Sequence, residues 1–259
     1  MTATEPLGLI LIGFAGMVAS AINAIAGGGS LISFPLLVAL GVPTIQANAT
    51  NSSALWPGSL SSAFGFRDQL AACGQSLWRL MPPTVLGALL GSLILLSTPA
   101  RVFDLAVPVL IAFATLLLAF QPRIKRWAIA GERTIQPAWG AFLQFLVALY
   151  GGYFGAGMGI LMLAYLGLML RGNLHEQNAV KAWLGVAINF FATAFFAWNG
   201  LILWPVAAAM AVGSVVGGYA AARISLKADP ERLRRGIVVI GAVMVVWFTY
   251  RTLGVASSG

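Results

Sequence analysis

The chain has 259 residues, of which 59% are hydrophobic and 8% are charged, and its mean hydropathy is +0.90. Because a soluble domain carries about 25% charged residues, this composition indicates a polytopic membrane protein with one transmembrane domain over residues 1–259. The single cysteine and the single histidine exclude an intramolecular disulfide and a cluster of Cys and His metal ligands. The net charge of +8 could suggest a nucleic-acid partner, but the basic residues lie in loops, where they orient membrane proteins.

Ten apolar segments follow one another along the chain, five in each half. We expect them to be helical, which predicts an all-α fold with a first half at 7–120, a cytoplasmic linker at 121–137 and a second half at 138–255. Segments 30–40 and 159–170 are too short to span a bilayer, because a span needs about 20 residues. The expected segments are 7–26, 30–40, 46–66, 79–97, 102–120, 138–156, 159–170, 176–198, 202–222 and 236–254.

One pattern occurs twice at an offset of 130 residues. In both copies a glycine run leads to a short apolar segment and then to a helix that begins with polar residues. A duplicated membrane unit with a glycine break in each copy is typical of secondary transporters. Identical residues at this offset include Gly27/Gly157, Gly29/Gly159, Leu31/Leu161, Leu36/Leu166, Asn48/Asn178, Ala49/Ala179, Val85/Val215 and Gly87/Gly217.

The basic residues predict the orientation of the halves. Twelve of them fall in loops that the positive-inside rule assigns to the cytoplasm, and both termini then lie outside. An outer N-terminus and a cytoplasmic linker require an odd number of crossings in each half, so we expect inverted-topology repeats. The twelve are Arg67, Arg79, Arg123, Lys125, Arg126, Arg133, Arg171, Arg223, Lys227, Arg232, Arg234 and Arg235.

The short segments allow two arrangements. Either 7–26 and 30–40 form a re-entrant helical hairpin, or the first crosses the membrane and the second crosses back as a short broken helix. The number of crossings is odd in both, so the inversion holds in both. Non-helical backbone at membrane depth requires surrounding protein or a cavity, which places the breaks at Gly27–Gly29 and Gly155–Gly159 inside the protein.

A glycine break before a short helix is a candidate anion site. It leaves backbone N–H groups at a helix N-terminus, where the partial positive charge attracts anions, and glycine lets a ligand approach the backbone closely. The alternative is close helix packing, for which small residues are common in membranes. The candidate binding positions are Gly28, Gly29, Ser30, Leu31, Gly157 and Gly159.

Polar residues follow each break. Asn48 and Asn51 are three residues apart and share one helix face, and so do Asn178 and Lys181. Intramembrane polar residues face the protein interior and mark binding sites, although asparagines also join helices by hydrogen bonds. Lys181 has no carboxylate at its helical partner positions, so a substrate anion could be its partner. The alternative is that its ammonium group reaches the nearby cytoplasmic interface.

The acidic residues argue against a cation substrate. None of the seven lies at the centre of a predicted span, whereas cation pumps and proton relays need buried carboxylates. We therefore expect a small anionic substrate, with membrane lipids as the other partner and no metal. Coupling to protons or to sodium stays open.

The motif around the first break resembles the TauE/SafE sulfite exporter family, also called the toluenesulfonate uptake permease family. The resemblance rests on the run from Asn23 to Pro35, with Gly27-Gly28-Gly29-Ser30, and on Ala47-Asn48-Ala49-Thr50-Asn51. In the second half, Gly155-x-Gly157-x-Gly159 and Asn178-Ala179-Val180-Lys181 fit the same family, and the resemblance covers nearly the whole chain. Ser30 and Pro35 are matched by Ile160 and Tyr165, so the two half-sites are chemically unequal.

The resemblance implies a multi-pass permease of the bacterial or archaeal inner membrane. Its implied substrates are sulfite, sulfonates, sulfoacetate or related anions, carried by alternating access between two inverted repeats. Neither the direction nor the exact substrate follows from it. We keep as alternatives a carrier of another organic anion or a neutral sulfur metabolite, and an anion channel. An enzyme is not expected, because the sequence has no constellation of catalytic residues.

Overall fold

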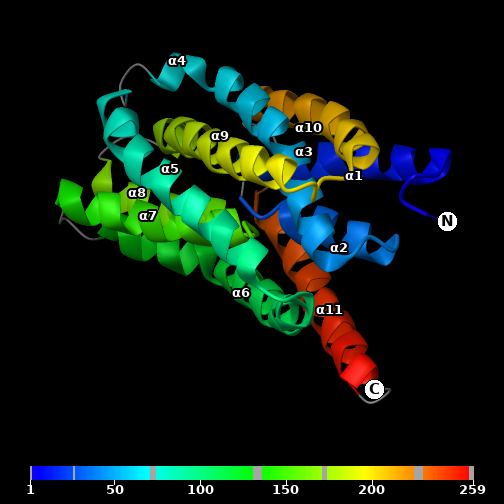
Figure 1. The fold of residues 1–259 in the computed structure, drawn as a ribbon. Coiled ribbons are helices and arrows are strands. Elements are labelled where there is room, and N and C mark those ends of the chain that lie inside the picture. Colours follow the sequence, from blue (N-terminus) through cyan, green and yellow to red (C-terminus); the bar gives the residue numbers. More distant parts are fainter. Residues whose placement is uncertain are drawn as a thin grey trace.

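The computed structural model describes residues 2–25, 27–70, 74–130, 136–170, 174–224 and 230–256 (Figure 1). Within these ranges the chain forms helices and no strand. The first half contains α1 (Pro6–Ile25), α2 (Ser30–Ala39), α3 (Thr44–Gly65), α4 (Arg67–Leu70), α5 (Gly74–Ser97) and α6 (Ala100–Ala130). The second half contains α7 (Pro137–Tyr153), α8 (Met158–Met169), α9 (Leu174–Trp198), α10 (Trp204–Ile224) and α11 (Pro230–Ala256).

Each of the ten expected segments corresponds to one helix, and the short helix α4 is an addition. Helix α6 continues to Ala130, so the first part of the expected linker at 121–137 is helical. The end of an apolar run marks the edge of the membrane and not the end of a helix. The linker residues 131–135, which include Arg133, lie outside the described residues, as do Arg171 and Lys227.

The protein is an all-α, multi-pass membrane protein. Five of the described helices are long and apolar enough to cross a bilayer: α1, α5, residues 100–123 of α6, residues 175–198 of α9, and residues 204–223 of α10. Helices α2 and α8 are apolar and short, as expected. Helix α3 is less apolar because it carries buried polar side chains along much of its length, which places it inside the bundle and not against lipid.

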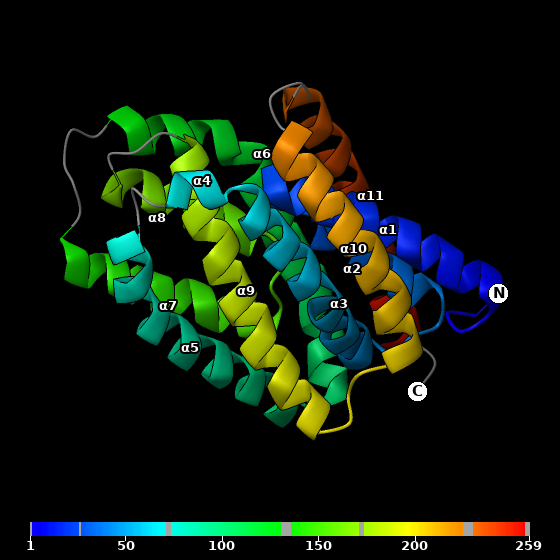
Figure 2. The same cartoon turned by 90° about the horizontal axis from the view of Figure 1, so that it is seen from above.

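Each half packs its later helices against the other half (Figures 1 and 2). Helix α10 packs on α1 and α3, while α5 packs on α7 and α9. Helix α11 contacts α2, and α6 contacts α8; the α3–α9 and α6–α11 pairs then join the halves. Exchanging the two halves leaves the α3–α9 and α6–α11 pairs unchanged and turns each of the other contacts into another one of the set. This matched packing supports the duplicated unit, and the opposite orientation of the two copies across the membrane stays a prediction.

Glycines allow the exchanged helices to touch through their backbones. A Cβ at Gly217 of α10 would collide with the carbonyl of Met17 in α1. Gly87, the match of Gly217, makes the same kind of contact in α5, where a Cβ would lie 2.5 Å from the carbonyl oxygen of Phe145 in α7. Such close approach maximises van der Waals contact, which drives helix association where lipid removes the hydrophobic effect.

The substitution Gly217→Ala should destabilise the protein, because the new methyl group has no space beside the α1 backbone. Overpacking of this kind costs about 1–3 kcal/mol, so the midpoint of thermal unfolding in detergent should fall. Gly236→Ala in α11 is the matched control, since a Cβ there meets nothing within 4 Å. Equal melting temperatures for the two variants would contradict the backbone contact between α1 and α10.

Candidate functional site

The two helix breaks meet in the middle of the bundle. Gly27 has a φ of 86° and Gly157 a φ of 78°, a left-handed conformation that favours glycine. A Cβ at Gly27 would lie 2.8 Å from the carbonyl carbon of Gly159 and 2.9 Å from the nitrogen of Ile160. If the repeats are inverted and the helix before each break crosses the whole membrane, the two breaks lie at opposite membrane faces. Their contact therefore favours the re-entrant hairpin over two full crossings.

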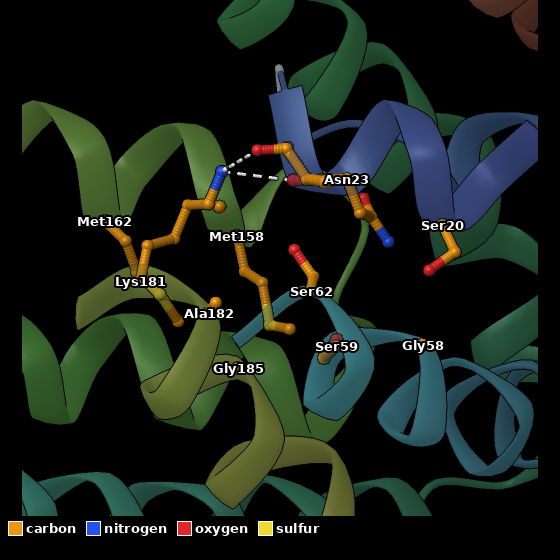
Figure 3. A pocket seen from close by; sticks show the side chains of 13 residues that line it. Ser20, Asn23, Gly58, Ser59, Ser62, Met158, Met162, Lys181, Ala182 and Gly185 are labelled. Carbon is orange, nitrogen blue, oxygen red and sulfur yellow. Dashed lines mark hydrogen bonds between the residues drawn. The ribbon is translucent and has the colours of Figure 1, made fainter. Parts of the chain in front are cut away.

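A cavity of about 40 Å³ borders this contact (Figure 3). A water molecule needs about 10–15 Å³ of such space, so the cavity holds a few waters or one compact solute. Both halves supply its walls, and none of the lining residues is acidic. They are Ser20, Asn23 and Ala24 of α1; Gly27 of the first break; Gly58, Ser59 and Ser62 of α3; Met158, Gly159 and Met162 of α8; and Lys181, Ala182 and Gly185 of α9.

Lys181 extends from α9 to the end of α1. Its Nζ donates to the carbonyl oxygen of Asn23 at 3.0 Å and to that of Ala24 at 3.1 Å (Figure 3). These carbonyls lie in the last turn of α1, where a helix has no backbone donors left to pair them and where a cation is favourable. Lys181 is 5% exposed, and its hydrogen bonds point it into the protein. The alternative that the sequence allowed, in which the ammonium group of Lys181 reaches the cytoplasmic membrane interface, is therefore wrong.

Ser62 presents an unpaired hydroxyl to the cavity. Its side chain is 3% exposed, and its Oγ has no hydrogen-bond partner within the described part of the chain. A buried polar atom without a partner costs about 1–3 kcal/mol, so a partner from outside the chain is favoured. Ser62 lies on α3 and Lys181 on α9, so the two side chains bring one hydroxyl and one amine to the same cavity from opposite halves.

The glycine N–H groups that the sequence offered as anion donors are in part paired within the protein. The N–H of Gly29 donates to Oδ1 of Asn23 at 2.7 Å, and that of Leu31 to the Gly28 carbonyl at 3.1 Å. Ser30 is buried, and Leu31 belongs to the hydrophobic core. None of these four break residues lines the cavity.

In the second break, Gly159 lines the cavity and Gly157 does not. A Cβ at Gly159 would lie 2.9 Å from Cα of Gly27 and 3.5 Å from Cδ of Lys181. At Gly157 it would lie 3.2 Å from Cβ of Ala114 in α6. Of the expected binding residues, the structure thus brings Gly159 and Lys181 together at one cavity.

The three predicted asparagines are buried outside the cavity lining. Asn48 donates to the Tyr153 carbonyl, at the end of α7, at 2.9 Å. Asn51 accepts a hydrogen bond of 2.6 Å from Ser33 of α2. Asn178 is 6% exposed, and its Oδ1 has no partner among the described residues. The first two join helices, which is the alternative that the sequence left open for them.

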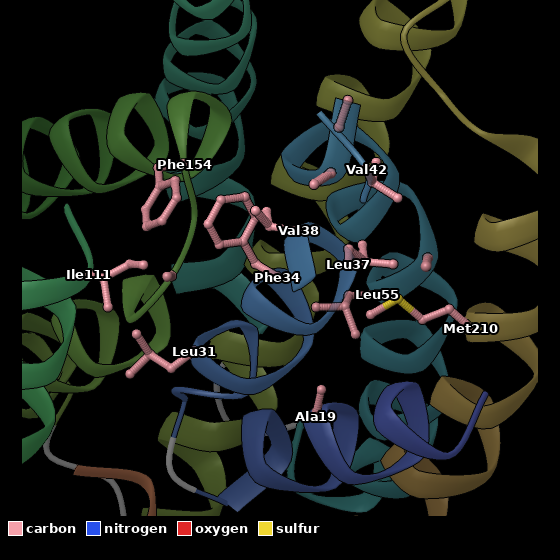
Figure 4. Close-up of a cluster of buried hydrophobic side chains, with 14 of the residues drawn as sticks. Ala19, Leu31, Phe34, Leu37, Val38, Val42, Leu55, Ile111, Phe154 and Met210 are labelled. Atoms are coloured by element: carbon pink, nitrogen blue, oxygen red, sulfur yellow. The ribbon is translucent and has the colours of Figure 1, made fainter. Parts of the chain in front are cut away.

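Aromatic residues pack together next to the second break. Phe34 of α2 packs edge-on against Phe154 at a ring distance of 5.3 Å (Figure 4), and Phe103 of α6 lies 6.3 Å from Phe154. All three are buried. At the offset of 130 residues, the small cavity residues Ser20, Asn23 and Ala24 are matched by Tyr150, Tyr153 and Phe154. The two half-sites therefore differ in volume as well as in charge, and it is the small residues of the first copy that line the cavity.

The sequence analysis did not identify Ser20, Ser59 and Ser62 as cavity residues. A signal was present, because Ser59 and Ser62 are three residues apart on one face of the polar helix α3. That spacing does not tell a cavity from a helix contact. The same helix contains Ser53, whose hydroxyl donates to the Ala49 carbonyl at 2.8 Å.

Comparison with known proteins agrees with the geometry of a transporter. The model of the family described as "Sulfite exporter TauE/SafE" matches residues 12–248. A probable membrane transporter protein of Haemophilus influenzae is 29% identical over 235 residues, which cover 91% of this chain and 92% of that protein. The probable membrane transporter protein YfcA of Escherichia coli K12 is 28% identical over 257 residues, 96% of this chain and 93% of YfcA. No solved structure matches the chain. The chain therefore belongs to the TauE/SafE sulfite exporter family.

Proposed function

We propose that the protein is a secondary transporter of small sulfur-containing anions, such as sulfite, sulfonates or sulfoacetate, and that the cavity between the two breaks binds them. The observation that carries the proposal is the lining: a buried lysine and an unpaired buried hydroxyl face a space with no acidic wall. An oxyanion presents several acceptors, and hydrogen bonds between a charged donor and an anion are among the strongest in proteins.

The family supports the sulfur class, and the cavity supports a compact member of it. The names of the relatives specify a membrane transporter and give no substrate. The volume of about 40 Å³ favours an anion of the size of sulfite over a bulky aromatic sulfonate. Lys181 supplies charge, Ser62 supplies a hydroxyl, and Gly159 keeps the wall free of a side chain.

Alternating access is the transport mechanism that we propose for this site. The cavity lies between the later part of α3 and the early part of α9, on the side that the positive-inside rule assigns to the cytoplasm. Phe34 and Phe154 pack edge-on against each other next to the second break. In transporters built from inverted repeats, rocking of one repeat against the other exposes the site alternately to the two sides.

Purified protein in detergent should be stabilised against heat by one or more sulfur anions. The panel is sulfite, thiosulfate, sulfate, sulfoacetate, taurine and acetate, and binding raises the melting temperature because the ligand favours the folded state. Lys181→Gln keeps a donor for the α1 carbonyls and removes the charge, so it should weaken binding by more than about tenfold. A response to acetate alone would favour a carboxylate carrier, and a folded protein that no anion stabilises would contradict the proposal.

Ser62→Ala should weaken binding of the same anion by about tenfold, because one hydrogen bond to a charged group is lost. The melting temperature without ligand should stay within error, since Ser62 gives up no hydrogen bond within the protein. Ser53→Ala is the matched control on α3: its side chain is buried away from the cavity, so ligand affinity should be unchanged. Loss of affinity in the control but not in Ser62→Ala would place the site elsewhere.

A carrier exchanges an anion on one side of the membrane for an anion on the other side, whereas a channel does not couple the two movements. Liposomes that contain the protein and are preloaded with unlabelled sulfite should transiently concentrate external labelled sulfite, because each return of the site carries an anion. A channel dissipates the gradient without such accumulation. Counterflow should be lost in Lys181→Gln liposomes, and simple equilibration in the wild type would contradict a carrier.

A further inference from the structure

We infer that Lys181 couples anion binding to the uptake of one proton, so that a monovalent anion enters the cavity together with a proton that the lysine amine carries. The inference rests on the proposed function and adds the coupling ion to it. It is drawn from the hydrogen-bond geometry of the amine and from the charges that surround the cavity.

The amine of Lys181 has two protein acceptors, the carbonyl oxygens of Asn23 and Ala24, at 3.0 and 3.1 Å. A neutral amine has two N–H donors, whereas the ammonium has three. Both forms therefore satisfy the two carbonyls at the end of α1. Only the ammonium form has a third N–H and a positive charge. An oxyanion in the cavity would accept a hydrogen bond from that N–H and be attracted by the charge.

Within the described part of the chain, no carboxylate lines the cavity to balance an ammonium group there. Helices α1 and α3, which pack against α9 beside Lys181, carry no charged or titratable side chain. The other described helices in contact with α9, and α9 itself, carry such groups, but none of them lines the cavity. These groups are Arg67 and Asp68 of α4, Arg79 of α5, Tyr150 and Tyr153 of α7, Tyr165 of α8, and His175 and Glu176 of α9.

Several of these charged and phenolic groups are paired with other residues. Asp68 is mostly exposed and lies 3.6 Å from Arg67 and 3.8 Å from Arg223. The hydroxyl of Tyr165 donates to Gln144 at 2.6 Å, and that of Tyr150 to the carbonyl of Ala156. An ammonium in the empty cavity would thus have only the partial negative charge of the α1 C-terminus beside it, and a cation without a full counter-charge inside a membrane domain is costly.

An incoming anion supplies that counter-charge. As it enters, the amine lone pair takes a proton from water and forms the third N–H bond, which then donates to the anion. As the anion leaves, this bond breaks and the proton returns to water. Because coupling between two ligands is reciprocal, the proton raises the affinity for the anion as much as the anion raises the affinity for the proton. Transport of a monovalent anion is then electroneutral.

The test counts protons taken up on binding, with a pH electrode in weakly buffered detergent solution. Thiosulfate is the first probe, because it does not take up protons near neutral pH. Sulfite is the second, and its own protonation is removed by taking the difference from Lys181→Arg. On the alkaline side the wild type should take up about one proton per anion bound, and the Kd should rise about tenfold per pH unit.

Lys181→Arg separates charge from proton uptake. Its guanidinium stays protonated, so it should bind thiosulfate without uptake and with a Kd that does not change with pH. Ser62→Ala is the matched control in the same cavity: it should bind more weakly and still take up one proton. If Lys181→Arg does not fold, the proton count of the wild type with thiosulfate decides.

Binding of thiosulfate by the wild type without proton uptake would overturn the inference and leave the proposed function standing. Uptake that persists in Lys181→Arg would also overturn it, because the proton would then go to another group. If neither thiosulfate nor sulfite binds the folded wild type, the proposed function itself fails. The three failures are thus distinguishable.

Discussion

Two helices end inside the membrane domain, and their free backbone groups must be paired by the protein because lipid offers no partner. In both halves a donor from the other half provides the pairing. Lys181 of the second half donates to carbonyls at the end of α1, and Asn48 of the first half donates to the Tyr153 carbonyl at the end of α7. Asn23 and Tyr153 occupy matching positions in the two copies. These crossed hydrogen bonds hold the two breaks together, and the cavity lies beside one of them.

The two copies pair the backbone groups at their helix ends with different side chains. This difference leaves space for the cavity in one copy. Where α1 ends, the residues are small and the donor is a lysine. Where α7 ends, the residues are aromatic and the donor is an asparagine, so side chains fill the matching space. A transporter with two equal half-sites would present the same chemistry to both sides of the membrane. In this chain the buried Lys181 and the cavity that it lines fall on the side of the first break.

The sequence was sufficient to predict the helices and the breaks, because hydropathy and glycine runs are local signals. The matched pair Gly87 and Gly217 was also visible, and both residues lie at equivalent helix contacts. The partners of Lys181 were not predictable, because Asn23 lies 158 positions away and its carbonyl carries no sequence signal. The prediction that the N–H groups of the breaks bind an anion was incomplete, because the protein itself pairs some of these donors. The N–H of Gly29, for example, donates to the side chain of Asn23.

The exchange of helices between the halves fixes when the fold can be completed. Helix α1 is made first, yet its main packing partner, α10, is among the last to leave the ribosome, and α5 must wait for α7 and α9. The close glycine contacts of α10 with α1 and of α5 with α7 need residues from both halves. Insertion into the membrane therefore precedes tertiary assembly, and the early helices remain in lipid with unpaired packing faces until nearly the whole chain has been synthesised.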